Sequence, residues 1–307
     1  MFRNARIYRL ENDWPESEEA VSRELAKAAF SPCGPLTDRS SGWVAIDTSN
    51  PNNSELLARR LHGADLLVLR SQSRILPAAA VNEALEERIE EYRQRMDEEP
   101  GRSEKRRMKA ETRDSLLPKA LLKSDKIRGY VELADQLVVV DAGQSAAAER
   151  FLRHLRLPFG DLTLKPLRYK QPVDALLKRI FLGDSPPRFD VGRECRMQDA
   201  SDAGSTVRWN DFDLADPSIR SHVADGMRLT HLAIVYDNIL HCVLDENGVI
   251  SKLKFVGADD DSTDDENDPL ARQDAEFVLL TGTLRNMLKD LKQLLGGYDQ
   301  SEPQALL

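Results

Sequence analysis

Two patterns near the C-terminal end of the chain constrain its fold most. Residues 228–238 and 239–255 together read as a β-meander, and Asn247-Gly248 marks a tight hairpin turn within it. Residues 277–295 then place large apolar side chains every three to four positions, as in a helix with one buried face. Strands that are neighbours in sequence pair antiparallel, and the helix must cover one face of their sheet. This segment therefore predicts an α+β fold.

The rest of the chain alternates strand-like and helix-like segments in the same way. The strand-like segments are 3–10, 42–47, 64–71, 136–142 and short stretches within 188–214. The helix-like segments are 16–30, 77–96, 145–155, 171–183 and 216–226, with a loop or a second helix after Pro100-Gly101. We expect antiparallel or mixed sheets with long helices, in an elongated or curved subunit of several domains.

Changes in composition divide the chain into four regions. They are an N-terminal α+β region (1–73), a helical basic region (74–130), a central α+β region (131–227) and a C-terminal region (228–307). The last region holds the β-meander, an acidic loop and the long helix with its heptad-like apolar stripe.

The formal net charge of −9 hides a strong segregation of charge along the chain. Residues 259–276 hold nine acidic residues and one Arg, a net charge of −8, and we expect them to form a solvated acidic loop. Residues 102–128 and 150–196 each carry a net charge of +6. A folded chain with such blocks can present a positive surface to nucleic acid despite its acidic total.

The cysteines and the hydropathy pattern indicate a protein of the reducing cytosol. Cys33, Cys195 and Cys242 are odd in number and widely spaced, which predicts small buried thiols rather than disulfides or a zinc site. No apolar run reaches the roughly 18 residues that a membrane span needs, and the N-terminus lacks the pattern of a signal peptide. We expect a cytoplasmic protein that does not enter the membrane.

No pattern of catalytic or metal-ligating residues stands out. The chain lacks a phosphate-binding glycine loop, a nucleophile elbow and the HExxH zinc motif. None of the five histidines lies three or four residues from another, as a helical metal site requires. Asp135 and Asp141 are a conceivable pair for Mg²⁺, but neither belongs to a recognisable metal motif. We expect no enzymatic activity, no cofactor and no metal.

The strongest positive feature is a basic cluster between residues 102 and 128. Its members are Arg102, Lys105, Arg106, Arg107, Lys109, Arg113, Lys119, Lys123, Lys126 and Arg128. Flexible cations along one surface neutralise phosphates and release counterions without reading bases. A solvated helix face would have the same composition, so both interpretations stay open. Aromatic residues are scarce here, which favours contact with a duplex backbone over base stacking.

Seven short segments together resemble the RdgC family of bacterial recombination-associated proteins. They are AFSPCG (29–34), GWV (42–44), RILP (74–77), DSLLPKAL (114–121), LVVVDA (137–142), SKLKF (251–255) and DAEFVLLTGTL (274–284). Each segment is modest alone, but their order and spacing make the match specific. The resemblance covers nearly the whole chain, from residue 7 to residue 297.

The resemblance implies a homodimer in the form of a closed ring that encircles duplex DNA without sequence preference. It also implies that the protein is associated with the nucleoid and restrains the RecA recombinase. The basic cluster, together with Arg74 and Arg208, would then bind DNA along the inner surface of the ring. Asn210 and Asp211 stand where relatives can carry lysines, so this part of the surface is expected to be less positive.

The apolar stripe of the C-terminal helix has two interpretations. It can pack in the core of its own subunit, or it can close the dimer. In the second case the dimer interface consists of Leu284, Met287, Leu288, Leu291 and Leu295. The alternative to a DNA-binding function is a protein-interaction module that acts through this helix and does not bind DNA.

Overall fold

The fold is an α+β arrangement, as the sequence predicts. The computed structural model describes residues 2–46, 56–160, 162–202, 204–257 and 269–299. Within these residues the chain forms seven α-helices, one short 3₁₀ helix and a sheet of twelve strands. All pairings between the named strands are antiparallel. The predicted α+β class is therefore confirmed, in its antiparallel form.

The elements follow one another in a mixed order along the chain. The strands are β1 (Asn4–Leu10), β2 (Arg39–Val44), β3 (Ala58–Leu61), β4 (Ala64–Ile75), β5 (Leu121–Glu132), β6 (Leu137–Val140), β7 (Leu164–Pro166), β8 (Phe189–Asp199), β9 (Thr206–Asn210), β10 (Met227–Tyr236), β11 (Leu240–Asp245) and β12 (Ile250–Phe255). The helices are α1 (Glu18–Ala26), α2 (Ala78–Met96), α3 (Arg102–Leu116), η1 (Leu117–Lys119), α4 (Ser145–Phe159), α5 (Val173–Leu182), α6 (Pro217–Ala224) and α7 (Pro269–Leu294).

The N-terminal strand β1 joins two halves of the sheet. The strand order is β2-β4-β5-β6-β1-β12-β11-β10-β8-β9, with β3 beside β4 and β7 beside β1. Arg6 to Arg9 pair with β6, whereas Asn4 and Ala5 pair with β12. The strand is therefore central in the sheet, not an edge strand, and its side chains alternate between buried and half-buried over most of its length.

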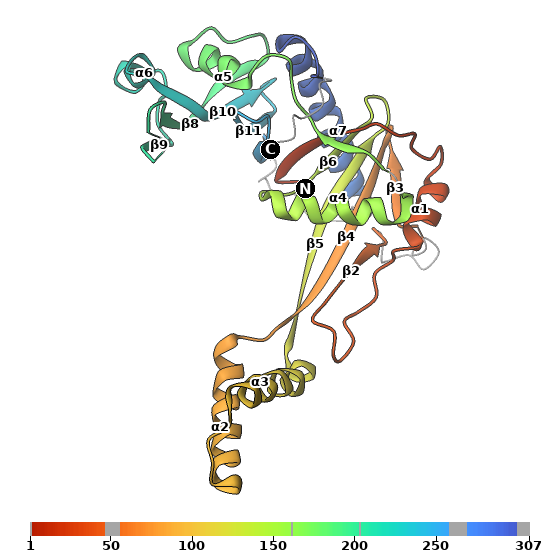
Figure 1. Cartoon of the computed structure of the whole chain (residues 1–307). Coiled ribbons are helices and arrows are strands. Elements are labelled where there is room, and N and C mark those ends of the chain that lie inside the picture. Colours follow the sequence, from red (N-terminus) through yellow and green to blue (C-terminus); the bar gives the residue numbers. More distant parts are fainter. Residues whose placement is uncertain (1, 47–55, 161, 203, 258–268, 300–307) are drawn as a thin grey trace.

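The molecule has three parts, which Figure 1 shows as a C-shaped outline. The body consists of strands β1 to β7 with α1 and α4. The lobe consists of strands β8 to β12 with α5 and α6. The arm consists of α2, α3 and η1, carried on the outer halves of β4 and β5. Helix α7 packs in one hydrophobic core that body and lobe share.

The two faces of the body's sheet are covered by different helices. Helices α1 and α4 bury Leu25, Phe151 and Leu155 against one face, in a core that includes Trp43. Helix α7 covers the other face, where Phe277 packs edge-to-face on Tyr130 with ring centroids 5.6 Å apart. Burial of these aromatic and aliphatic side chains is the main source of stability for the body.

The arm is a helical hairpin with little apolar packing. Val81 is the buried residue of α2, and Thr112 is the buried residue of α3. The apolar spacing correctly predicts the helix α2. Among the described residues the helix that packs against it is α3, and Met96 remains 51% exposed. Pro77 is the N-cap residue of α2 rather than a residue of its first turn. The segment after Pro100-Gly101 is a second helix, which resolves that alternative.

The structure differs from the sequence-based expectation at two places. The predicted boundaries at 73/74 and 130/131 fall inside β4 and β5, because the arm is inserted between two strands of one hairpin. The predicted acidic loop lies partly outside the described residues. Its last part, from Pro269 onward, is the beginning of α7 rather than a loop.

The thiol and membrane expectations can be compared with the described part of the chain. Cys33, Cys195 and Cys242 are all buried free cysteines, as predicted. Among the described residues, no helix combines the length and the apolar character that crossing a bilayer requires.

Gly129 on β5 provides a test of the body's core. A Cβ atom at this position would lie 2.4 Å from Cζ of the fully buried Phe151. We expect Gly129→Ala to lower the free energy of unfolding by about 1–3 kcal/mol, the usual effect of overpacking. Thermal or denaturant unfolding measures this change.

Gly282→Ala is the matched control, because nothing lies within 4 Å of a Cβ built there in α7. Ala favours a helix over Gly by up to about 1 kcal/mol, so this variant should be as stable as the wild type or more so. Equal stability of the Gly129 variant would contradict the packing described here.

Candidate nucleic-acid interface

Helix α3 displays most of the predicted phosphate-binding cations. They are Arg102, Lys105, Arg106, Arg107, Lys109 and Arg113. Three of the six are ion-paired. Lys105 Nζ lies 3.2 Å from Glu99, Arg107 lies 3.6 Å from Glu111, and Arg113 pairs with Asp38 on the body.

The other three cations of α3 form a stripe on one side of the helix. No carboxylate in the described part of the chain pairs with Arg102, Arg106 or Lys109. Their spacing of four and three residues places them on one face, over a length of about 10 Å. Helix α3 contains no aromatic, Asn or Gln side chain. Its chemistry therefore suits contact with phosphates and offers little for base stacking or adenine readout.

The remaining members of the basic cluster are distributed over two faces. Lys119 is exposed at the end of η1. Lys126 and Arg128 point to the α7 side of β5, and Lys123 points to the α4 side, because side chains alternate along a strand. Lys123 also lies 3.8 Å from Asp125. The structure thus does not bring all ten residues of the cluster onto one surface.

Arg74 anchors the arm to the body. Its guanidinium group donates hydrogen bonds to the carbonyl oxygens of Leu117, Pro118 and Ala120 at 3.0–3.3 Å, and to that of Gly34 at 3.0 Å. These four acceptors connect η1 and the beginning of β5 with the loop before β2. Because its donors are engaged in this way, Arg74 is better placed to fix the arm than to receive a phosphate.

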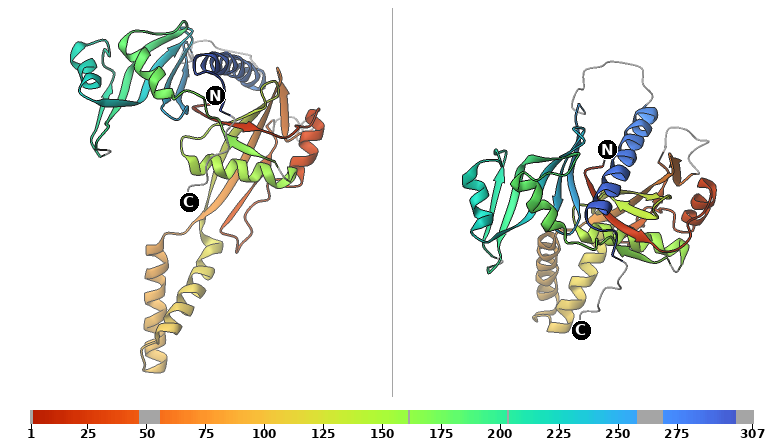
Figure 2. Two further views of the ribbon diagram at one scale, coloured as in Figure 1. Left: turned by 45° about the horizontal axis from the view of Figure 1, so that its top comes forward. Right: turned by 90° about the horizontal axis from the view of Figure 1, so that it is seen from above.

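A second positive surface lies on the lobe, on the face of its sheet opposite α5 and α6, which no helix of the described residues covers. Helices α5 and α6 bury one face, including Leu232, Ile234 and Tyr236. In Figures 1 and 2, α5 lies on the side of the sheet turned away from the arm. We call the opposite face the open face. Its cations are Arg196, Arg208, Arg228, Lys252 and Lys254.

Sequence reasoning finds only Arg208 among the cations of the open face. A signal for two others was present, because Lys252 and Lys254 alternate with Leu253 and Phe255, which are buried. Arg208 is 56% exposed and its Nη2 atom lies 2.7 Å from Glu194. Asn210 is neutral and Asp211 is acidic, so neither adds positive charge here.

The apolar stripe of α7 lies in the interior of its own chain. Leu284, Met287, Leu288, Leu291 and Leu295 are each at most 4% exposed and belong to the core shared by body and lobe. The core-packing interpretation therefore describes their position in the subunit. As a subunit contact the stripe has almost no exposed surface, so a dimer interface needs other residues.

The largest apolar exposure near the arm occurs where it meets the body. Ile75 and Leu121 are direct cross-strand partners of β4 and β5, and they are 47% and 76% exposed. Leu36 on the neighbouring loop is also exposed. An apolar cross-strand pair left in water is typical of a surface that another molecule covers.

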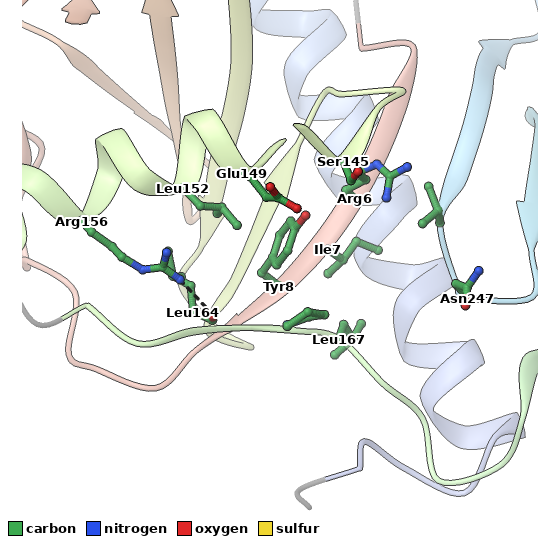
Figure 3. A pocket seen from close by; sticks show the side chains of 13 residues that line it. Arg6, Ile7, Tyr8, Ser145, Glu149, Leu152, Arg156, Leu164, Leu167 and Asn247 are labelled. Carbon is green, nitrogen blue, oxygen red and sulfur yellow. Dashed lines mark hydrogen bonds between the residues drawn. The ribbon is translucent and has the colours of Figure 1, made fainter. Parts of the chain in front are cut away.

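A cavity of about 390 Å³ lies between β1, α4, β7 and the β11–β12 turn (Figure 3). Arg6 lines it and donates to the carbonyl oxygens of Ala142 and Gly143 at 3.1 and 3.0 Å. Arg156 donates to the carbonyl of Leu164 at 3.2 Å. Both guanidinium groups are therefore engaged in hydrogen bonds to backbone carbonyl oxygens. The lining contains no His or Cys, but it does hold the hydroxyl groups of Tyr8 and Ser145 and the carboxyl group of Glu149.

The described residues contain no cluster of side chains suited to hold a metal ion. No three His, Cys, Asp or Glu side chains come together within them as a metal ion would require. Asp135 and Asp141 lie at opposite ends of β6, and Asp141 accepts hydrogen bonds from the backbone N–H groups of Arg3 and Asn4. Burial raises the pKa of the Cys242 thiol to about 12, so it stays protonated and unreactive.

Comparison with known proteins identifies one family. A family model described as "Putative exonuclease, RdgC" matches residues 1–298. The recombination-associated protein RdgC of Pseudoalteromonas atlantica is 31% identical over 304 residues, which cover 98% of this chain and 99% of that protein. The protein of the same name from Sodalis glossinidius is 30% identical over 299 residues, covering 96% of this chain and 97% of that protein.

The role of Arg74 leads to a prediction about the arm. Replacement of Arg74 by Met keeps an unbranched apolar stem and removes all donors to the four carbonyl groups. We expect backbone amides in residues 31–38 and 115–122 to exchange with deuterium roughly tenfold faster, since hydrogen bonds from a charged donor are being lost. Hydrogen exchange by mass spectrometry measures this effect.

Arg106→Met is the control for this experiment, because Arg106 is an exposed cation of the same arm with no carboxylate partner among the described residues. It should leave exchange in both segments unchanged. Unchanged protection in the Arg74 variant would show that the anchor is not needed to hold the arm.

Proposed function

The chain belongs to the RdgC family, and from this premise we propose that it binds duplex DNA through the phosphate backbone and acts in recombination. Its curated relatives carry the name recombination-associated protein. The observation that supports DNA binding best is the stripe of Arg102, Arg106 and Lys109 on α3. These cations lack carboxylate partners in the described chain, so they can neutralise phosphates without first breaking an ion pair.

Two separated positive surfaces support contact with an extended polyanion. The stripe of α3 lies on the arm, and the cations of the open face lie on the lobe, at the other end of the C-shaped outline (Figure 1). A duplex carries negative charge along its whole length, so a curved protein can contact it at both ends of the curve. Helix α3 has no Asn, Gln or aromatic side chain, which supports binding of the arm without sequence preference.

We further propose that two copies of the subunit close into a ring around DNA. The C-shaped outline supports this idea, because two such subunits that meet at both ends enclose a hole. The apolar pair Ile75 and Leu121 offers a contact surface at the base of the arm. A ring that occupies the duplex would limit the access of the RecA recombinase. Nucleoid association follows from the same binding.

A catalytic role in DNA cleavage is the alternative that the family description raises. Metal-dependent nucleases hold their ions with several carboxylate or imidazole groups at one point. The described residues bring no three such groups together. We therefore propose a binding function without catalysis. Incubation of DNA with the protein and Mg²⁺ or Mn²⁺ tests this point, and specific cleavage that follows the purified protein would overturn it.

The proposed function predicts how DNA binding depends on salt concentration and on whether the DNA is linear or circular. Binding to duplexes of unrelated sequence should be equally tight, and log K should fall linearly with log salt concentration. A closed ring cannot slide off a circle, so covalently closed circular DNA should dissociate more slowly than linear DNA of the same length. Fluorescence titration and filter-retained dissociation assays measure the two effects. Absence of binding at low salt would contradict the proposed function.

The second prediction concerns the unpaired stripe of α3. The triple variant R102Q/R106Q/K109Q should lower the slope of log K against log salt by about 0.9 for each lost phosphate contact. The matched control is K105Q/R107Q, which removes two ion-paired cations from the same helix. The control should change the slope by less per residue. Equal effects per residue would show that total charge matters and that the stripe does not.

A further inference from the structure

Two β-bulges bring distant parts of the lobe together on the open face. In β8, the register with β10 shifts between Cys195 and Val191, so three residues of β8 lie opposite Ala233. In β12, the register with β11 shifts between Lys254 and Ser251. Bulges redirect side chains away from the simple alternation of a strand. Glu194 and Lys252 lie within these two irregular segments.

Glu194 holds two cations from strands that do not pair with each other. Its Oε1 atom lies 2.7 Å from Nη2 of Arg208 on β9, and its Oε2 atom lies 2.5 Å from Nζ of Lys252 on β12. We call these three residues the bulge cluster. Burial raises the pKa of the Glu194 carboxyl, but the hydrogen bonds from both cations outweigh it, and the pKa is lowered overall. Glu194 is therefore ionised near neutral pH.

The backbone at Lys252 is strained in a way that favours this contact. Its φ angle is +53°, in the left-handed region that residues with a Cβ atom seldom adopt. Strain of this kind persists only where the surroundings enforce it, and it occurs often at functional sites. An Asn or Gly would adopt the same conformation at lower cost, so the presence of Lys indicates that its charge matters.

The cluster keeps a surplus of positive charge and of free donors. Two cations share one carboxylate, and Arg196 is the cross-strand partner of Arg208 on the same face. No carboxylate in the described part of the chain pairs with Arg196. A guanidinium group has five N–H donors and an ammonium group has three. Arg208 and Lys252 are 56% and 55% exposed, so their remaining donors face solvent.

We propose that the bulge cluster is a binding site for a DNA backbone phosphate and that Glu194 occupies it in the absence of DNA. A carboxylate and a phosphodiester are both oxyanions that accept hydrogen bonds from the same cations. DNA must therefore displace Glu194, or share the cations with it, which lowers its affinity. Glu194 is thus an internal competitor that limits the strength of binding. This inference rests on the proposed DNA-binding function.

Glu194→Gln tests the competition directly. The amide keeps the size of the side chain and one acceptor oxygen, but it removes the negative charge. We expect the variant to bind duplex DNA about three- to tenfold more tightly at low salt, the range that one or two exposed ion pairs correspond to. The slope of log K against log salt should become steeper by about one for each protomer in contact with DNA.

Lys252→Asn and Arg208→Gln test whether the two cations belong to one site. Asn tolerates the left-handed backbone of position 252, so this variant should fold normally. Each variant should weaken binding. The loss caused by Lys252→Asn should be larger in the Glu194→Gln background than in the wild type, because the Gln variant leaves Lys252 uncompensated. This double-mutant cycle measures the coupling between the carboxylate and the cation.

Lys178→Gln is the matched control, since Lys178 is an exposed cation on α5, which covers the other face of the same sheet. Its loss should change affinity much less than the loss of Lys252. Thermal unfolding of all variants confirms that they are folded.

The outcomes separate this inference from the function on which it rests. If the wild-type protein does not bind DNA, the proposed function fails. If the wild type binds DNA and Glu194→Gln binds it equally or more weakly, the DNA-binding function stands. The proposal that Glu194 competes with DNA is then wrong. Equal effects of Lys178→Gln and Lys252→Asn would likewise overturn the assignment of the site.

Discussion

The arrangement of the whole molecule depends on the pairing of β1 with two neighbours. Its inner residues hydrogen bond to β6 of the body, and Asn4 and Ala5 pair with β12 of the lobe. Asp141 reinforces the junction by accepting hydrogen bonds from the backbone of Arg3 and Asn4. Because so few residues make the β12 contact, α7 is needed as well, and its buried stripe spans both parts. The direction of the open face is therefore set by core packing.

An acidic chain can offer positive surfaces because cations outnumber carboxylates locally on parts of its surface. Glu132 holds Arg285 and Asp65 holds Arg60 in partly buried pairs that stabilise the fold. On α3 and on the open face, cations exceed carboxylates. Exposed ion pairs contribute little to stability, so their distribution is free to serve binding. Net charge consequently says little about the partner of this protein.

The sequence predicts local structure well and spatial relations poorly. Apolar periodicity predicts α2, α7 and the β-meander, and the number and spacing of the cysteines predict that Cys242 is a buried thiol. Periodicity cannot show that Arg74 donates hydrogen bonds to backbone carbonyl groups, because the acceptors lie some forty residues away in both directions. It also misses Glu194 and Lys252 as partners. Each sits in a bulge, and a bulge breaks the alternation on which strand interpretation depends.

A protein that binds DNA without reading bases obtains nearly all of its affinity from charge. The limit on that affinity must then also come from charge, since there is no base contact whose loss could weaken the complex. A carboxylate fixed among the cations provides such a limit without loss of fold stability. The bulges of β8 and β12 are what allow one carboxylate to reach cations on two unpaired strands.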